Sequence, residues 1–448
     1  MIKRAFVVIL SALLLVGCGS AETPTVTSAP ENPTQTEAPA EVDDNDKKDD
    51  SAAETPTVNE DSSEEKPAEE VHDVAVNTIS EETKEKAKSF PKVNGKLPKW
   101  RGVNVVDKAE FAWSWVAASP SYPEDVEDTS NTVYKEAEAI EISEAGYNFV
   151  RICLDSRYFF TDESKVTLEN VGSKFYGSID TANLTQYENL DQMIEWCINR
   201  DIHVCLDCHS TYGGLMIGGD EETSRKKLFT PGSKAQKMFI EHWKRLAVRY
   251  ADVDTKALSF NLYNEPPAFA TSKEGVYVKL LNKAIDEIQK VTDDRLIFVD
   301  MMQYGTQGMK KIKELHANNL VACFHFYGPD VADTEVKDID LQACMSDISS
   351  RLPSYNSYAK KNKVRWMLQE YGCNCNIKES KREKYCKAII KYCKSKGVPY
   401  ALWAFNDNAF NVATWANGTD KFIPPGAKYV ETSQGHRINK KMAEITSK

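Results

Sequence analysis

The first part of the chain has almost no aromatic residues: apart from Phe6, no Phe, Tyr or Trp occurs before Phe90. A segment so poor in large apolar side chains cannot bury enough surface to offset the entropy lost on ordering its backbone. Residues 18–90, rich in Pro, Thr and Glu, are therefore predicted to form a disordered linker. We place the folded domain at residues 91–448 and expect a chain that starts near Lys88 to fold.

The chain also lacks an apolar run long enough to cross a bilayer comfortably as a helix. The run at residues 5–16 follows Lys3 and Arg4 and has the length of an export signal, so residues 1–17 are predicted to be a signal peptide. The following sequence, Leu-Val-Gly-Cys ending at Cys18, resembles the bacterial lipobox. That resemblance implies a lipid-modified Cys18, and several acyl chains hold a protein stably on a membrane. We expect an exported protein, lipid-anchored at the bacterial cell surface.

The folded part carries almost no net charge. Residues 19–90 hold 20 acidic and 6 basic side chains and Lys3 and Arg4 precede them, so the chain's net charge of −11 leaves residues 91–448 at about +1. A nucleic-acid-binding domain would have a basic surface, so no nucleic-acid partner is expected. The acidity belongs to the linker.

Ten cysteines follow Cys18, and Cys153 is the first of them. Several of them stand inside apolar runs, where a cysteine behaves as a small apolar residue, and a domain of this size needs no disulfides to hold its core. We predict mostly free thiols. Their spacing offers no zinc site, and the sequence has neither a phosphate-binding glycine loop nor a Gly-x-Ser-x-Gly motif, so neither a metal nor a cofactor is expected.

From Trp100 onward, short apolar runs alternate with segments of helical periodicity. Predicted strands are residues 102–106, 149–154, 202–207, 258–262, 296–300, 321–326, 365–369 and 400–404. Predicted helices are residues 131–145, 187–199, 233–250, 274–291, 308–316, 341–361, 379–396 and 437–447. Eight strands that each precede a helix favour a (β/α)8 TIM barrel of the α/β class. An open doubly wound sheet is the alternative, but no glycine-rich turn follows the first strand.

A barrel of this kind collects its active site at the carboxyl ends of its strands. Polar and aromatic side chains occur at those ends in six of the eight predicted strands: Arg151, His209, Asn264, Glu265, His325, Tyr327, Glu370 and Trp403. Each alone has an ordinary explanation, such as a turn, a core histidine or a packed ring. Their joint placement is what indicates a catalytic site.

These residues stand in motifs that resemble glycoside hydrolase family 5, most closely its bacterial cellulases. The matching segments are RGVN at Arg101, AGYNFVRICLD at Ala145, LDCHS at Leu206, LFTP at Leu228, LSFNLYNEP at Leu258, FHFYGP at Phe324, LQEYG at Leu368 and ALWAF at Ala401. The resemblance implies Glu265 as acid/base and Glu370 as nucleophile, with the other six residues binding substrate around them. Many relatives have a second histidine where this chain has Ser210, so no role is carried to that position.

The chemistry of a retaining glycosidase agrees with these residue types, because it needs one protonated and one ionised carboxyl group about 5–5.5 Å apart. Arg151 is expected to lower the pKa of Glu370 and keep it ionised, while Glu265 keeps its proton. Asn264 suits a sugar 2-hydroxyl. Rings offer flat faces to sugars, so Trp403 is expected beside the cleaved bond, and Trp113 further along the cleft unless it merely packs within its loop.

We therefore expect a monomeric catalytic domain that binds and cuts a β-linked polysaccharide, as an endo-β-1,4-glucanase or alternatively as an endo-β-1,4-mannanase. A non-catalytic sugar-binding lipoprotein is a different possibility, but it has no use for two glutamates at strand ends. A structural envelope lipoprotein leaves the whole set of strand-end residues unexplained.

Overall fold

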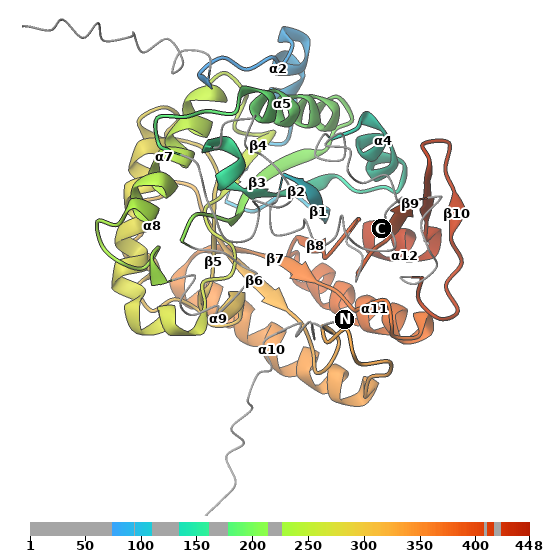
Figure 1. Ribbon diagram of the computed structural model, residues 1–448. Helices are drawn as coiled ribbons and strands as arrows, with labels where there is room; N and C mark the ends of the chain where they lie inside the picture. Colours follow the sequence, from blue (N-terminus) through green and yellow to red (C-terminus); the bar gives the residue numbers. More distant parts are fainter. Residues whose placement is uncertain are drawn as a thin grey trace, which may run out of the picture. The chain divides into compact units, whose positions relative to one another are not determined.

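Eight parallel strands close into a barrel in which each strand pairs with the next and β8 returns to β1 (Figure 1). The computed structural model describes residues 74–93, 95–109, 134–160, 178–213, 226–406, 410–415 and 423–448. The strands are β1 (Arg101–Ala109), β2 (Phe149–Asp155), β3 (His203–Ser210), β4 (Leu258–Asn261), β5 (Ile297–Asp300), β6 (Leu320–Phe326), β7 (Arg365–Tyr371) and β8 (Tyr400–Leu402). Each overlaps a predicted apolar run, so the (β/α)8 TIM barrel is confirmed and the open sheet is wrong.

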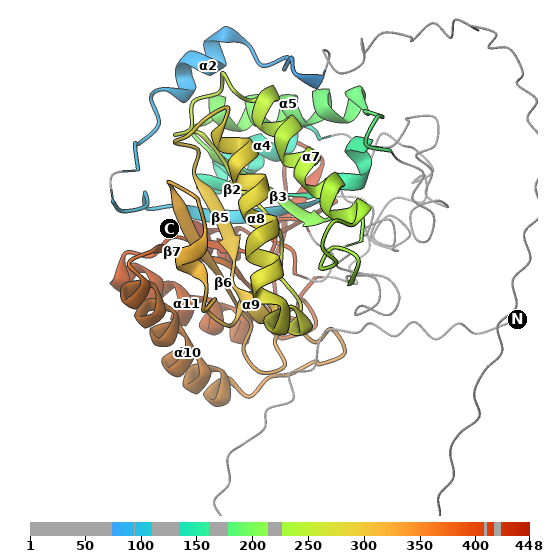
Figure 2. The same cartoon turned by 90° about the vertical axis from the view of Figure 1, so that its left-hand side faces the viewer.

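Helices surround the strands on the outside of the barrel (Figures 1 and 2). They are α4 (Glu136–Glu144), α5 (Leu184–Asn199), α7 (Lys234–Arg249), α8 (Glu274–Gln289), α10 (Leu341–Asn362) and α11 (Glu379–Lys396). Side-chain oxygens of Asn183 and Ser233 accept backbone N–H groups at the starts of α5 and α7, and Gly397 ends α11 in the left-handed conformation. In α5, Leu190 and Ile194 are buried, as its periodicity predicts.

The helix predicted at residues 308–316 is wrong. The segment between β5 and β6 instead holds α9 (Met302–Gly305) and the 3₁₀ turn η7 (Ile312–Glu314). The backbone N–H of Lys311 donates to the side chain of Glu274 at 2.7 Å, and Gly308 lies directly against the Tyr358 ring. Long-range contacts therefore take the place of helical hydrogen bonds here. Two further 3₁₀ helices, η3 (Ser156–Phe160) and η6 (Ala268–Lys273), follow β2 and β4.

A small antiparallel sheet follows the barrel, and the sequence did not predict it. It consists of β9 (Ala413–Trp415), β10 (Val430–Glu431) and β11 (His436–Ile438), in the order β10-β11-β9. The last helix, α12 (Lys440–Ser447), begins after Asn439, whose side chain accepts the N–H of Met442. The expected helix start at residue 437 is therefore wrong, because Arg437 pairs with Thr414 in the sheet.

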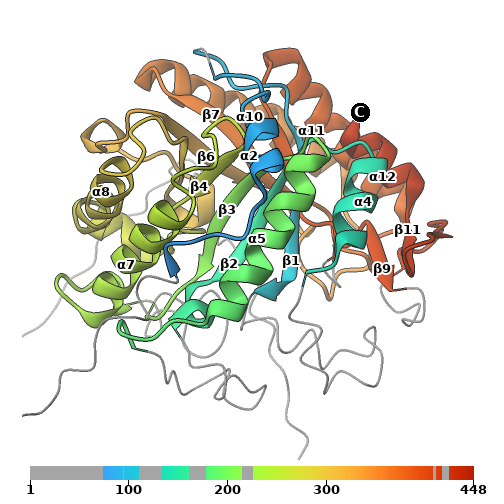
Figure 3. The same cartoon turned by 90° about the horizontal axis from the view of Figure 1, so that it is seen from above.

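Residues 74–90, which we call the N-terminal strap, pack on the helices α5 and α7. The strap contains the helix α2 (Glu81–Ala87), capped by Ser80, and it lies beside α5 (Figures 1 and 3). Its apolar side chains Val74, Ile79, Ala87 and Phe90 are buried in the main core.

Hydrogen bonds also tie the strap to the barrel. Thr78 donates its backbone N–H to Asp191 of α5 at 2.7 Å, and Arg249 of α7 donates to the carbonyl of Val74 at 2.9 Å. The predicted linker boundary at residue 90 is therefore wrong for residues 74–90, which are part of the folded domain. The signal peptide, Cys18 and the rest of the predicted linker lie outside the described residues.

Aromatic rings fill the amino-terminal end of the barrel. Trp100, just before β1, has its ring centre 5.0 Å from that of Phe149 and 4.4 Å from that of His203. The chemistry-bearing side chains lie at the other end. The ten cysteines after Cys18 are buried free thiols, as predicted. Among the described residues, no helix is both long and apolar enough to traverse a bilayer.

Candidate active site

The barrel brings seven of the nine predicted catalytic and substrate-binding residues to its carboxyl-terminal end. Arg151 lies deeper in the barrel, within β2. Arg151 is in β2, His209 near the end of β3, His325 near the end of β6 and Glu370 near the end of β7, while Asn264, Glu265, Tyr327 and Trp403 come just after strands. Trp113 lies outside the described residues. Parallel strands in a barrel present the same end to one mouth, which is why residues from six strands meet.

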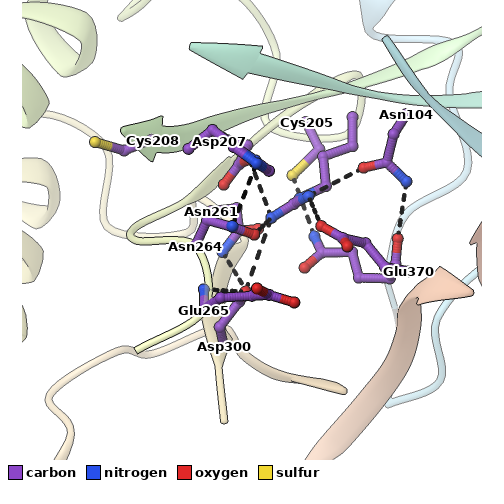
Figure 4. Close-up of polar contacts among 12 residues, drawn as sticks. Asn104, Cys205, Asp207, Cys208, Asn261, Asn264, Glu265, Asp300 and Glu370 are labelled. Atoms are coloured by element: carbon purple, nitrogen blue, oxygen red, sulfur yellow. Dashed lines mark hydrogen bonds and ion pairs between the residues drawn. The ribbon is translucent and has the colours of Figure 1, made fainter. Parts of the chain in front are cut away.

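Arg151 is the centre of this arrangement and is fully buried. Its guanidinium donates to five carboxylate and amide oxygens at 3.0 Å or less and lies 3.8 Å from a sixth oxygen, Oδ2 of Asp300. Figure 4 shows Asn104, Asp207, Asn264 and Glu370 close together in this network. The five nearest oxygens are Asn104 Oδ1 at 3.0 Å, Asp207 Oδ2 at 3.0 Å, Asn261 Oδ1 at 2.9 Å, Asn264 Oδ1 at 2.6 Å and Glu370 Oε1 at 2.7 Å. A planar guanidinium with several fixed donors orients each of these groups. Asn264 and Glu370 are thus held in one geometry by the same side chain.

The two glutamates face each other across His325. The ring Nδ1 of His325 lies 2.8 Å from Glu265 Oε1 and 3.4 Å from Glu370 Oε2. A carboxylate oxygen of Glu265 lies within 4.8 Å of one of Glu370. Tyr327 donates its hydroxyl to Glu370 Oε2 at 3.0 Å. Both glutamates are nearly buried, with 8% of the surface of Glu265 and 4% of that of Glu370 exposed.

The pKa of Glu370 is raised, whereas the sequence analysis expected it to be lowered. Burial is the largest cause and raises the pKa, the nearby charge of Glu265 raises it further, and His325 and Arg151 lower it. The predicted effect of Arg151 is thus present, but burial outweighs it. An ionised Glu370 depends on its positive neighbours and on its hydrogen bonds.

Trp403 and His209 form a stacked pair at the site. Their ring centres are 5.2 Å apart with an interplanar angle of 20°. His209 Nδ1 lies 2.8 Å from Asp207 Oδ2, and burial lowers the pKa of His209 to about 3, so the imidazole is neutral. Trp403 is only 7% exposed, so it packs against the barrel as well as facing the site. Ser210, where no role was predicted, is fully buried.

Four polar residues below the glutamates were not singled out from the sequence: Asn104, Asp207, Asn261 and Asp300. Each is fully buried and hydrogen-bonded within the site. The available signal was a lone polar residue inside an apolar strand, because such a group must find a partner when buried. Which partner it finds depends on how the barrel closes, because the partners stand on other strands.

Two groups of side chains bring three potential metal-ligand atoms within 4.8 Å of one another: Cys153, Asp207 and His209, and Glu265, His325 and Glu370. Arg151 contacts a carboxylate of each group, at 3.0 Å in Asp207 and 2.7 Å in Glu370. A fixed positive charge at that distance disfavours a second cation. The carboxylates therefore suit a reaction that uses their own charge and protons.

Comparison with protein families gives a direct match. Residues 107–409 match the family described as cellulase (glycosyl hydrolase family 5). The chain belongs to glycosyl hydrolase family 5. The predicted glutamates Glu265 and Glu370 both fall within the matched region.

Individual relatives are distant. Endoglucanase 3 of Fibrobacter succinogenes (strain ATCC 19169 / S85) is 20% identical over 287 residues, which are 53% of this chain and 42% of that protein. The chain thus covers well under two thirds of the length of this relative. A crystal structure of a glycoside hydrolase superposes with a TM-score of 0.60 at 20% identity, covering 78% of this chain and 99% of that one.

The Cel5A of Thermotoga maritima also has a similar fold. Its structure with cellobiose gives a TM-score of 0.54 at 17% identity over 81% of this chain and 99% of that one. Its structure with mannotriose gives a TM-score of 0.52 at 18% identity, over 70% of this chain and 92% of that one. At such identities these structures demonstrate the shared fold and no more.

Proposed function

We propose that this protein is a retaining glycoside hydrolase that cuts a β-linked polysaccharide by double displacement. The observation that carries the proposal is the pair of strand-end glutamates, whose nearest carboxylate oxygens are at most 4.8 Å apart. Retaining enzymes have carboxyl groups about 5–5.5 Å apart, and inverting enzymes need about 6.5–9.5 Å to admit a water molecule. The measured proximity supports retention.

In the first step, Glu370 attacks the anomeric carbon and Glu265 gives its proton to the departing sugar oxygen. The bond from the anomeric carbon to that oxygen breaks as the bond to Glu370 forms. The hydrogen bonds from Arg151 and Tyr327 keep Glu370 oriented and favour its ionised form. Family membership and the strand-end positions support these roles.

In the second step, Glu265 takes a proton from water as the water oxygen attacks the anomeric carbon, and Glu370 leaves as a carboxylate. Asn264, held at 2.6 Å by Arg151 through its Oδ1, is suited to bind the sugar 2-hydroxyl. That contact strengthens as the sugar acquires oxocarbenium character. The Trp403 ring is the platform proposed for the sugar beside the cleaved bond.

For the substrate we propose a β-1,4-glucan cut at internal bonds, which fits the cellulase description of the matched family. A β-1,4-mannan is the second candidate, because the similarly folded Cel5A is recorded with both cellobiose and mannotriose. The proposal also keeps the expected export, with a lipid on Cys18 attaching the enzyme to the cell surface.

The test is reducing-end release from a panel of soluble β-glucans and mannans, combined with NMR of the first product before mutarotation. A β-configured first product and a rapid loss of viscosity are expected. An α-configured first product overturns the retaining assignment. The absence of hydrolysis across the panel, with sugar binding intact, overturns the enzymatic one.

A further inference from the structure

Asp300 is the last residue of β5 and contacts both Glu265 and His325. It has no part in the mechanism proposed above. It is fully buried. Its Oδ2 accepts the backbone N–H of Glu265 at 3.0 Å and lies 3.2 Å from Nε2 of His325. Its Oδ1 accepts the side-chain amide of Asn261 at 3.0 Å. Figure 4 shows Asp300 next to Glu265 within this network.

The contact with the Glu265 backbone holds an unusual conformation. Glu265 has φ +45°, in the left-handed region that side chains other than glycine rarely adopt. Such a conformation persists only where its surroundings stabilise it. A buried carboxylate that accepts the N–H of the same residue is such a stabiliser, and it aims the Glu265 side chain at His325.

The contact with His325 decides how that ring can exchange a proton. A carboxylate oxygen 3.2 Å from Nε2 favours a proton on that nitrogen through its charge, although the angle is not that of a hydrogen bond. The other nitrogen, Nδ1, faces Glu265 Oε1 at 2.8 Å. A neutral His325 then accepts a hydrogen bond from protonated Glu265 through Nδ1. A charged His325 instead donates one to ionised Glu265. A single proton is thereby shared between the two side chains.

The charges around His325 favour its protonated form. Burial alone would lower the pKa of His325, but Glu370 and Asp300 outweigh it and hold the pKa well above its usual range. His325 in turn, with Arg151, lowers the pKa of Asp300 to about 2 against the effect of burial. The charged or titratable groups that act on His325 are Asp207, His209, Glu265, Asp300 and Glu370, and Arg151 acts on Asp300 beside it.

We propose that Asp300 is a positioning residue, which aims Glu265 through its backbone and sets His325 as the partner that shares the acid proton of Glu265. This rests on the proposed function, in which Glu265 is the acid/base. When Glu265 protonates the departing oxygen, the pair loses one proton. When water attacks in the second step, the pair regains one proton, so the cycle balances.

The test variant is Asp300→Asn, which keeps the shape of the side chain and an oxygen acceptor but removes the charge. Without that charge the pair binds its shared proton less tightly, so the basic limb of the pH profile of kcat/KM moves to lower pH, by about one pH unit. Unactivated oligosaccharides lose about tenfold to a hundredfold in kcat/KM. A dinitrophenyl glycoside, which departs without protonation, loses far less in its first step.

The matched control is Asp155→Asn, at the end of β2. Asp155 is also fully buried, but it accepts hydrogen bonds from Arg157 at 3.0 Å and forms no hydrogen bond or ion pair with Glu265 or His325. Asp155→Asn should not move the basic limb of the pH profile of kcat/KM. If Asp300→Asn also leaves the limb unmoved and slows both substrates equally, Asp300 is merely structural and the proposal is wrong.

Two further measurements keep the outcomes separable. If Asp300→Asn does not fold, NMR of ¹⁵N-labelled histidine in the unaltered protein tests the proposal instead. A proton on Nε2 of His325 is expected at every pH. A neutral ring that carries its proton on Nδ1 overturns the proposal. Glu265→Ala is assayed in parallel with added azide. If azide restores Glu265→Ala turnover but the basic limb of the Asp300→Asn pH profile does not move, only the Asp300 proposal is rejected. If azide does not restore Glu265→Ala turnover, the acid/base assignment itself is rejected.

Discussion

Glu265 and Glu370 share His325 as a neighbour, yet their charged surroundings differ. Arg151 contacts Glu370 directly at 2.7 Å, and Tyr327 donates to it at 3.0 Å. Glu265 instead follows β4 and has its backbone held by Asp300 at 3.0 Å. A carboxylate next to a fixed cation suits a nucleophile, and one beside a proton-sharing imidazole suits an acid/base.

The first prediction separates these two roles. Glu370→Ala should abolish turnover of every substrate, because no glycosyl-enzyme can form. Glu265→Ala should still react in the first step with a dinitrophenyl glycoside, whose leaving group needs no proton, and then stall. Added azide needs no general base, so it should speed Glu265→Ala turnover and give a β-glycosyl azide, identified by NMR.

The reverse pattern would contradict the assignment. If Glu265→Ala with azide instead yields an α-glycosyl azide and Glu370→Ala yields a β-glycosyl azide, the nucleophile and acid/base roles are exchanged and the assignment is wrong. Circular dichroism of both variants controls for loss of the fold.

The second prediction concerns the acid limb of the pH profile. In the proposed mechanism Glu370 acts in its ionised form, and burial raises its pKa. As the solution is acidified, activity should therefore fall at a higher pH than for an exposed glutamate. Tyr327→Phe removes a hydrogen bond that favours ionised Glu370. The acid limb of kcat/KM should then move to still higher pH, by up to about one unit.

Asn376→Ala, at an exposed position outside the site, is the control and should not move either limb. An acid limb that stays in place in Tyr327→Phe, with activity merely reduced, would mean that the hydroxyl does not tune the ionisation of Glu370.

At the scale of elements, the N-terminal strap is the largest departure from what the sequence indicated. Its polar contacts centre on the buried ion pair between Asp191 of α5 and Arg249 of α7, 2.6 Å apart. Thr78 donates to that carboxylate, and Val74 accepts from that guanidinium. Without the strap, this pair would face solvent with part of its hydrogen bonding lost.

The third prediction compares two apolar residues of the strap. Ile79 is 3% exposed, so Ile79→Ala should lower the free energy of unfolding by about 2–4 kcal/mol, the usual cost of removing a buried aliphatic side chain. Val76 is 67% exposed, so Val76→Ala is the matched control and should change the free energy of unfolding by less than about 0.5 kcal/mol. Chemical denaturation followed by tryptophan fluorescence measures both.

A chain that starts at Phe90 should accordingly be less stable than one that starts at Ala68, with a lower Tm. Equal stability of these two chains, or of the Ile79 and Val76 variants, would show that the strap contributes nothing to the fold.

At the scale of the whole molecule, the excess of acidic over basic side chains lies before residue 91. Residues 19–90 carry 20 acidic and 6 basic groups, of which residues 19–73 lie outside the described part of the chain. A hydrophilic segment of this length is suited to hold a catalytic domain away from a membrane surface. Its proposed attachment point is the lipid on Cys18.

The fourth prediction tests that attachment. The full chain produced in a bacterium with lipoprotein processing should sediment with membranes and be released by detergent. Cys18→Ala should accumulate as an unprocessed precursor or appear in the soluble fraction, because no thiol remains to be acylated. The Cys197→Ala chain, altered at a buried cysteine, is the control and should still sediment with membranes. Membrane retention of Cys18→Ala after removal of its signal peptide would exclude the lipid anchor.

Local patterns in the sequence determined the barrel and the strand-end glutamates. An apolar run encodes a buried strand whatever lies elsewhere, and helical periodicity encodes a covering helix, so strand order and strand ends could be read directly. Placing Glu265 after β4 and Glu370 in β7 then required only the rule that strand ends share one mouth.

The tertiary structure alone decided the partners of these groups. Asp300 reads as the last residue of an apolar strand, yet barrel closure puts it under Glu265 and against His325. The strap reads as a continuation of a polar linker, yet Ile79 is buried in the main core, which no local pattern predicts. The pKa of Glu370 likewise follows from its burial, which outweighs its contact with Arg151. Such outcomes depend on contacts between residues far apart in the chain, and those contacts exist only once the barrel has closed.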